Sequence, residues 1–80
     1  MKEYIATFHT HLAALMTSRT LTGLGVQARM MPVPRKLSSS CGTCVRYLAA
    51  EPNLDAMDED VEAVYEKIGK EEYALLMNAD

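Results

Sequence analysis

The chain has 80 residues, about half the length of a typical domain, so we expect a single domain over residues 1–80 and no separate regulatory module. Hydrophobic residues make up 49% of the sequence and charged residues 24%, a balance that excludes an intrinsically disordered tail. A core this small leaves no room for a deep cleft, so we expect no cofactor.

The net charge of −3 hides an uneven distribution of charge along the chain. Residues 1–50 carry six Lys or Arg against Glu3 alone, whereas residues 51–80 carry ten acids against Lys67 and Lys70. Aromatic residues are only 6% of the chain, so the basic half lacks the stacking side chains of a nucleic-acid binder, and we expect no nucleic acid. The longest apolar runs have five residues, against the ~20 needed to cross a bilayer, and no signal peptide is recognisable. We therefore expect a cytoplasmic protein with no membrane partner.

The hydrophobic pattern predicts strands and helices in the order β-α-β-β-α-β. In chain order they are a strand over 3–8, a helix over 11–21 capped by Thr10, strands over 26–31 and 43–49 with a loop over 32–42 between them, a helix from Asn53 or Asp55 to Gly69, and a strand over 72–78. The second helix is predicted from apolar residues that recur at intervals of three and four, which are Leu54, Met57, Val61, Val64 and Ile68.

This order predicts an α+β fold, the ferredoxin-like sandwich with a four-stranded antiparallel sheet and two helices on one face. Because the crossover between the first two strands is right-handed, the end of the first strand, the start of the first helix and the 32–42 loop should meet at one end of the sheet. We therefore expect His9 and His11 to face Cys41.

The loop contains the run Met31-Pro32-Val33-Pro34-Arg35-Lys36-Leu37-Ser38-Ser39-Ser40-Cys41-Gly42. This run resembles the MPVPR-x-LSSSCG motif of the selenium/sulfur (Se/S) carrier protein-like family, small bacterial domains of unknown function. The resemblance implies that the chain holds sulfur or selenium on a cysteine, and it implies donor and acceptor proteins for that atom. The size of the chain favours a carrier over a classical enzyme, because a carrier needs a protected nucleophile and a docking face, whereas an enzyme usually needs a substrate pocket.

The residues themselves predict a reactive thiolate at Cys41, because a thiolate needs nearby positive charge, hydrogen-bond donors and partial exposure. The alternative is a small inert residue in a turn. The groups that would support the thiolate are Arg35, Lys36, Ser38, Ser39, Ser40 and Gly42.

Cys41 and Cys44 form a C-x-x-C spacing, so Cys44 is a candidate resolving thiol and a thiol-disulfide redox protein is an alternative function. His9 and His11 would complete a Cys₂His₂ zinc set, which makes a metal-binding module a further alternative. A proton-shuttle role needs only one imidazole near the sulfur, and His9 is the candidate.

The sheet face that carries no helix is the other predicted interaction surface. Arg29 and Arg46 are expected there, alongside Ile5, Leu48 and Leu76. A second copy of the chain is a candidate partner for this open face.

Overall fold

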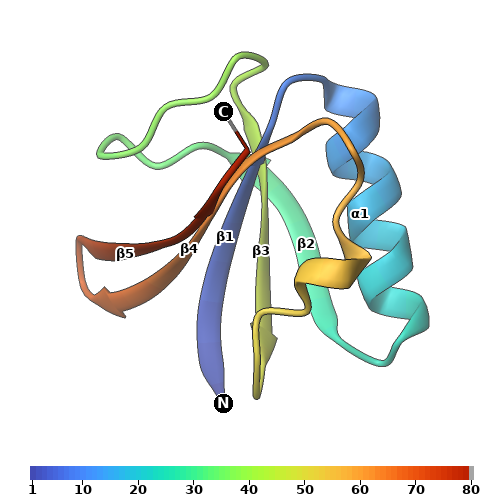
Figure 1. The fold of residues 1–80 in the computed structure, drawn as a ribbon. Helices are drawn as coiled ribbons and strands as arrows, with labels where there is room; N and C mark the ends of the chain where they lie inside the picture. The colour runs from blue at the N-terminus through green and yellow to red at the C-terminus, as the bar shows by residue number, and fades with distance from the viewer. Residues whose placement is uncertain (80) are drawn as a thin grey trace.

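The computed structural model of the protein describes residues 1–79. It contains five strands, one α-helix and a short 3₁₀ helix, η1, at Leu54–Ala56 (Figure 1). The strands are β1 (Lys2–Phe8), β2 (Gln27–Pro32), β3 (Thr43–Ala49), β4 (Val61–Gly69) and β5 (Glu72–Asn78), and the helix is α1 (His11–Gly23). They form one antiparallel sheet in the order β2-β3-β1-β4-β5. No helix in the described part of the chain is long and apolar enough to cross a membrane.

The ferredoxin-like fold predicted from the sequence is wrong, because the sheet has five strands and only one α-helix covers it. The predicted helix ending at Gly69 is instead η1 followed by β4. Val61 and Val64, three residues apart, do lie in the same core as the pattern required. A β-bulge explains the spacing, since Val61 pairs with Phe8 and Ala63 pairs with Thr7, which leaves Glu62 as an extra residue between two positions of β1.

The first half of the chain agrees with the predicted elements to within two residues at each end. Thr10 caps α1, because its side chain accepts a hydrogen bond from the backbone N–H of Ala13 at 3.1 Å. Gly25, with φ of 83°, then turns the chain into β2. The small residues Ala13 and Ala14 allow α1 to pack closely on the sheet, where the core residues are Tyr4, Ala6, Phe8, Leu21, Val45, Tyr47, Ala49, Val61 and Val64.

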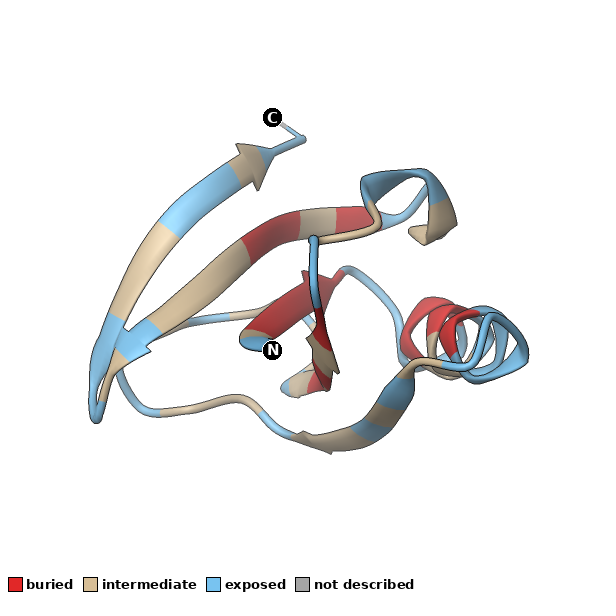
Figure 2. Ribbon diagram, turned by 90° about the horizontal axis from the view of Figure 1, so that it is seen from below, coloured by how far each residue is buried: buried red, intermediate tan, exposed pale blue. Residues whose placement is uncertain are grey.

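The sheet face away from α1 is closed at its centre, although the sequence predicted it to be open. Ile5, Thr7 and Cys44 are buried there. Figure 2 shows the reason, because the sheet curls and the 33–42 loop lies on the side opposite α1. Arg46 does lie on this face, where its Nε donates to Glu3 Oε2 at 2.7 Å.

Candidate functional site at the end of β1

Three segments that are far apart in the sequence meet where β1 ends: the β1–α1 junction, the 33–42 loop and the start of β4 (Figure 1). The loop is closed at its base by a hydrogen bond from Val33 N to the carbonyl oxygen of Gly42 at 3.1 Å. Gly42 has φ of 75°, a left-handed conformation that other residues rarely adopt. The predicted meeting of the loop with the end of β1 is therefore confirmed.

Cys41 lies at the centre of this junction and is partly exposed. Its Sγ is 3.4 Å from the carbonyl oxygen of Phe8 and 3.5 Å from that of Thr43, and either oxygen can accept the single thiol proton. Ser39 Oγ lies 3.7 Å from the same sulfur. Since carbonyl oxygens can only accept, the Ser39 hydroxyl is the contact that can donate to a negatively charged sulfur.

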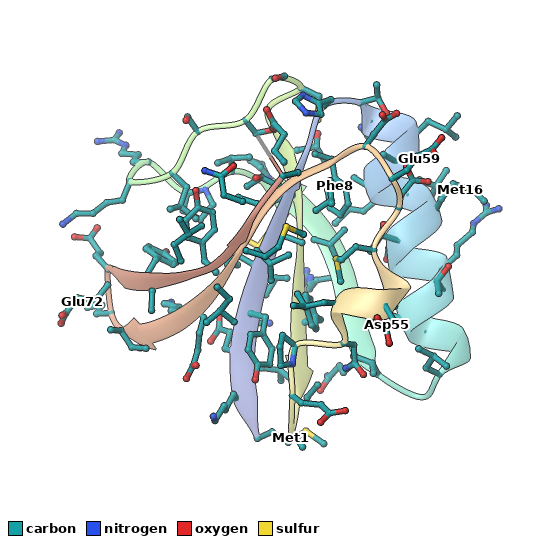
Figure 3. All side chains as sticks on the ribbon, in the orientation of Figure 1. Met1, Phe8, Met16, Asp55, Glu59 and Glu72 are labelled. Atoms are coloured by element: carbon teal, nitrogen blue, oxygen red, sulfur yellow. The ribbon has the colours of Figure 1, made fainter. Side chains whose placement is uncertain are left out.

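Ser39 also ties the loop to β1. Its hydroxyl donates to the carbonyl oxygen of Phe8 at 2.9 Å and accepts from Cys41 N at 3.3 Å. Figure 3 labels Phe8 near the upper end of β1, the end of the sheet at which the loop lies. One serine side chain thus sets the position of the Cys41 backbone relative to the sheet.

Glu62 anchors the loop from the other side. Its Oε1 accepts from Ser40 N at 3.0 Å and its Oε2 accepts from Ser40 Oγ at 2.7 Å. His9 Nδ1 lies 3.3 Å from Oε2 and 3.4 Å from Ser40 Oγ. Burial alone would raise the pKa of Glu62, but the hydrogen bonds from Ser40 and Ser39 and the charge of His9 outweigh it and lower that pKa.

The sequence prediction did not include Glu62 in the site, because it placed this residue in the second predicted helix. The bulge leaves Glu62 without a partner residue on β1, and its side chain reaches the loop. The signal that could have revealed the strand is the run Val61-Glu62-Ala63-Val64-Tyr65, whose β-branched and aromatic residues favour a strand.

Cys44 is less accessible than Cys41. Its side chain is fully buried on the sheet face away from α1, and its Sγ donates to the carbonyl oxygen of Pro32 at 3.7 Å. Burial, together with the nearby Cys41 sulfur, raises the pKa of Cys44 to about 11. Both cysteines are free thiols.

The predicted histidines approach the loop, but neither imidazole forms a hydrogen bond with a cysteine sulfur in residues 1–79. His9 contacts Ser40 and Glu62, while His11 Nδ1 lies 3.4 Å from Thr43 Oγ1. Within the same residues no group of three or more His, Cys, Asp or Glu side chains is placed to hold a metal ion. The Cys₂His₂ set is therefore not assembled.

The remaining predicted site residues lie at the edges of the loop. Arg35 and Lys36 are exposed, and neither forms an ion pair or a side-chain hydrogen bond within the described part of the chain. Ser38 lines a polar hollow of about 140 Å³ beside Thr7 and Glu62. The structure thus brings Ser39 to Cys41 and brings Ser40 and His9 to Glu62, without the two basic side chains.

Comparisons with known proteins identify a family and one similar protein. A family model described as "Putative Se/S carrier protein-like" matches residues 3–74. The chain is similar to the uncharacterized protein YtiA of Escherichia coli (strain K12), with 33% identity over 45 residues. That match covers 56% of this chain and 53% of YtiA, so the chain spans about half the length of the relative. No solved structure matches the chain.

Proposed function

We propose that this chain, which belongs to the Se/S carrier protein-like family, accepts a sulfur or selenium atom on Cys41 from a donor protein and passes it to an acceptor protein. The proposal rests on one observation, the difference in exposure between the two thiols. Cys41 is partly exposed among hydrogen-bonding groups, whereas Cys44 is buried and has a pKa of about 11. One accessible thiol is what a carrier needs.

The transfer is an exchange between thiols and is balanced without an external oxidant. The Cys41 thiolate attacks the terminal sulfur of a donor persulfide, R–S–SH. The new S–S bond forms on Cys41, the S–S bond of the donor breaks, and the donor sulfur takes up the proton that Cys41 gave. A donor of the type R–S–SeH reacts in the same way at selenium. An acceptor thiolate then removes the terminal atom by the same exchange.

The neighbours of Cys41 have distinct parts in this proposal. The Ser39 hydroxyl turns from the Phe8 carbonyl oxygen to donate to the terminal atom when that atom is an anion. His9 is 45% exposed, and its Nε2 makes no hydrogen bond within residues 1–79, so the imidazole is free to carry protons between the loop and solvent. The exposed Arg35 and Lys36 attract a negatively charged donor.

The same observation weighs against a redox protein that cycles between dithiol and disulfide. That cycle needs Cys44 to attack as a thiolate, and burial opposes its ionisation. A zinc module would need Cys41, Cys44, His9 and His11 together, which the described residues do not provide.

The intact mass of the protein tests the carrier function. Reduced protein is incubated with glutathione persulfide, and in a second series with the corresponding selenium compound, GS–SeH. We expect the wild-type protein and Cys44→Ala to gain one sulfur or selenium atom, and Cys41→Ala to gain none. A Cys44→Ala protein that folds, as judged by circular dichroism, yet forms no adduct would contradict the carrier and favour the redox protein.

A further inference from the structure

A groove runs between α1 and residues 51–58, on the side of the molecule away from the 33–42 loop (Figure 1). It consists of two adjoining hollows of about 570 and 260 Å³, and both are lined by Thr20, Asp55 and Ala56. We call it the α1–η1 groove. Figure 3 shows Met16 and Asp55, which both line it, on the same side of the molecule.

The groove presents apolar side chains from two different elements. Leu24, just after α1, is 63% exposed, and Leu54 of η1 is 40% exposed, although both line the larger hollow. Met16 of α1 is 46% exposed and lines the smaller one. Single exposed leucines are ordinary on protein surfaces, but several along one hollow indicate an interaction surface.

On the η1 side of the groove, the charged side chains are all acidic. Residues 51–60 contain no Lys or Arg, and within residues 1–79 none of their carboxylates forms an ion pair. The last turn of α1, whose dipole end is negative, also contains no basic residue. The acids concerned are Glu51, Asp55, Asp58, Glu59 and Asp60.

We propose that the α1–η1 groove docks a segment of a partner protein in which Lys or Arg stands beside aliphatic side chains. The aliphatic groups would cover Leu24 and Leu54, and the basic groups would lie against Glu51 and Asp55. The unpaired carboxylates are the feature that selects this occupant, because they would repel an acidic or phosphate-bearing partner.

The position of the groove relative to Cys41 fits a partner that exchanges sulfur with it. The start of α1 contacts the loop region through His11 and Thr43, whereas Leu24 follows the other end of the helix. A 13-residue helix is about 20 Å long, a distance that about six extended residues span. A docked segment can therefore be short and still leave its reactive group at Cys41. In this sense the docking proposal rests on the proposed function.

The test is a titration of ¹⁵N-labelled reduced protein with three synthetic nonapeptides, followed by NMR. We expect the peptide of alternating Lys and Leu to shift the amide signals of Thr20, Leu24 and Leu54. A peptide of alternating Lys and Ser should bind at least about tenfold more weakly, because it lacks apolar contact. A peptide of alternating Glu and Leu should not bind.

Variants separate the groove from general charge attraction. The change Glu51→Lys with Asp55→Lys should weaken binding of the Lys/Leu peptide about tenfold, and Leu54→Ser should weaken it as well. The matched control is Glu71→Lys with Glu72→Lys, which changes the net charge equally at the β4–β5 turn, far from Asp55 in Figure 3. The control should stay within about threefold of the wild-type affinity.

Three outcomes would overturn the proposal: no saturable shifts at the groove, equal weakening in the groove variant and the control, or groove shifts that grow with protein concentration alone. The last result would assign the groove to a second copy of the chain. Every substituted side chain is exposed, and circular dichroism checks that the variants fold. Repeating the titration with Cys41→Ala removes the sulfur chemistry but leaves the groove intact. Peptide binding by this variant therefore tests the docking proposal independently of the carrier function.

Discussion

The change Glu62→Gln tests whether this carboxylate holds the 33–42 loop on the sheet. Glu62 accepts from Ser40 N at 3.0 Å and from Ser40 Oγ at 2.7 Å, and it lies 3.3 Å from His9 Nδ1. A hydrogen bond to a charged group contributes about 1.5–3 kcal/mol. Because the side chains of Glu62 and His9 are 20% and 45% exposed, solvent screens part of this contribution. We expect Glu62→Gln to lower the free energy of unfolding by about 1.5 kcal/mol near neutral pH, and Tm by about 6–12 °C for a chain of this size.

The pH dependence distinguishes the charge from the shape of the side chain. The pKa of Glu62 is lowered from its ordinary value of 4.5, so the stabilisation is fully present above that value and is lost as the pH falls through the lowered pKa. The difference in Tm between the wild-type protein and Glu62→Gln, measured by circular dichroism, should therefore shrink steadily at acid pH. Glu66→Gln is the matched control, because Glu66 lies in the same strand and its carboxylate makes no hydrogen bond within residues 1–79. An equal loss of Tm in both variants, or a difference that persists in acid, would refute the reasoning.

Three further predictions concern the loop and its sulfurs. At about pH 8, a pKa of about 11 leaves about one Cys44 side chain in a thousand as thiolate. Iodoacetamide should therefore modify only Cys41 in the folded protein and both cysteines in urea. Early labelling of Cys44 would contradict its burial. Ser39→Ala removes the donor to the Phe8 carbonyl oxygen, so urea unfolding should show a free energy of unfolding lower by about 1 kcal/mol. Mass spectrometry should also show a shorter lifetime of the Cys41 adduct. If both values are unchanged, Ser39 has no part in the site. Gly42→Ala introduces a side chain at φ of 75° where no atom lies within 4 Å. Backbone strain of about 1–2 kcal/mol should therefore lower Tm, measured by circular dichroism, by about 4–16 °C, and a larger loss would contradict the open space around this residue.

The sequence was sufficient to predict the local elements of the first half and the end of the sheet where the loop lies. Thr10 before an apolar stripe and Gly25 after it define a helix by local chemistry. The loop lies at the Phe8 end of the sheet because β1 and β2 run in the same direction, both antiparallel to β3. The exposure of Arg35 and Lys36, away from the Cys41 sulfur, could not be predicted in this way. Charges that are neighbours of Cys41 in the sequence need not contact its sulfur, because the path of a ten-residue loop depends on its tertiary anchors.

The error over residues 54–69 and the omission of Glu62 have one physical origin. Apolar residues three apart share a face in a helix, but a bulge in a strand produces the same spacing, as Val61 and Val64 do here. The extra residue of that bulge is Glu62, whose carboxylate accepts both hydrogen bonds from Ser40. An alternating strand without the bulge would have been recognisable from the sequence, but it would pair Glu62 with a residue of β1 and move its side chain relative to the loop. The bulge that made the strand look like a helix is therefore also the feature that places Glu62 against the loop, so a change of register at Val61-Glu62-Ala63-Val64 should disturb the Cys41 site.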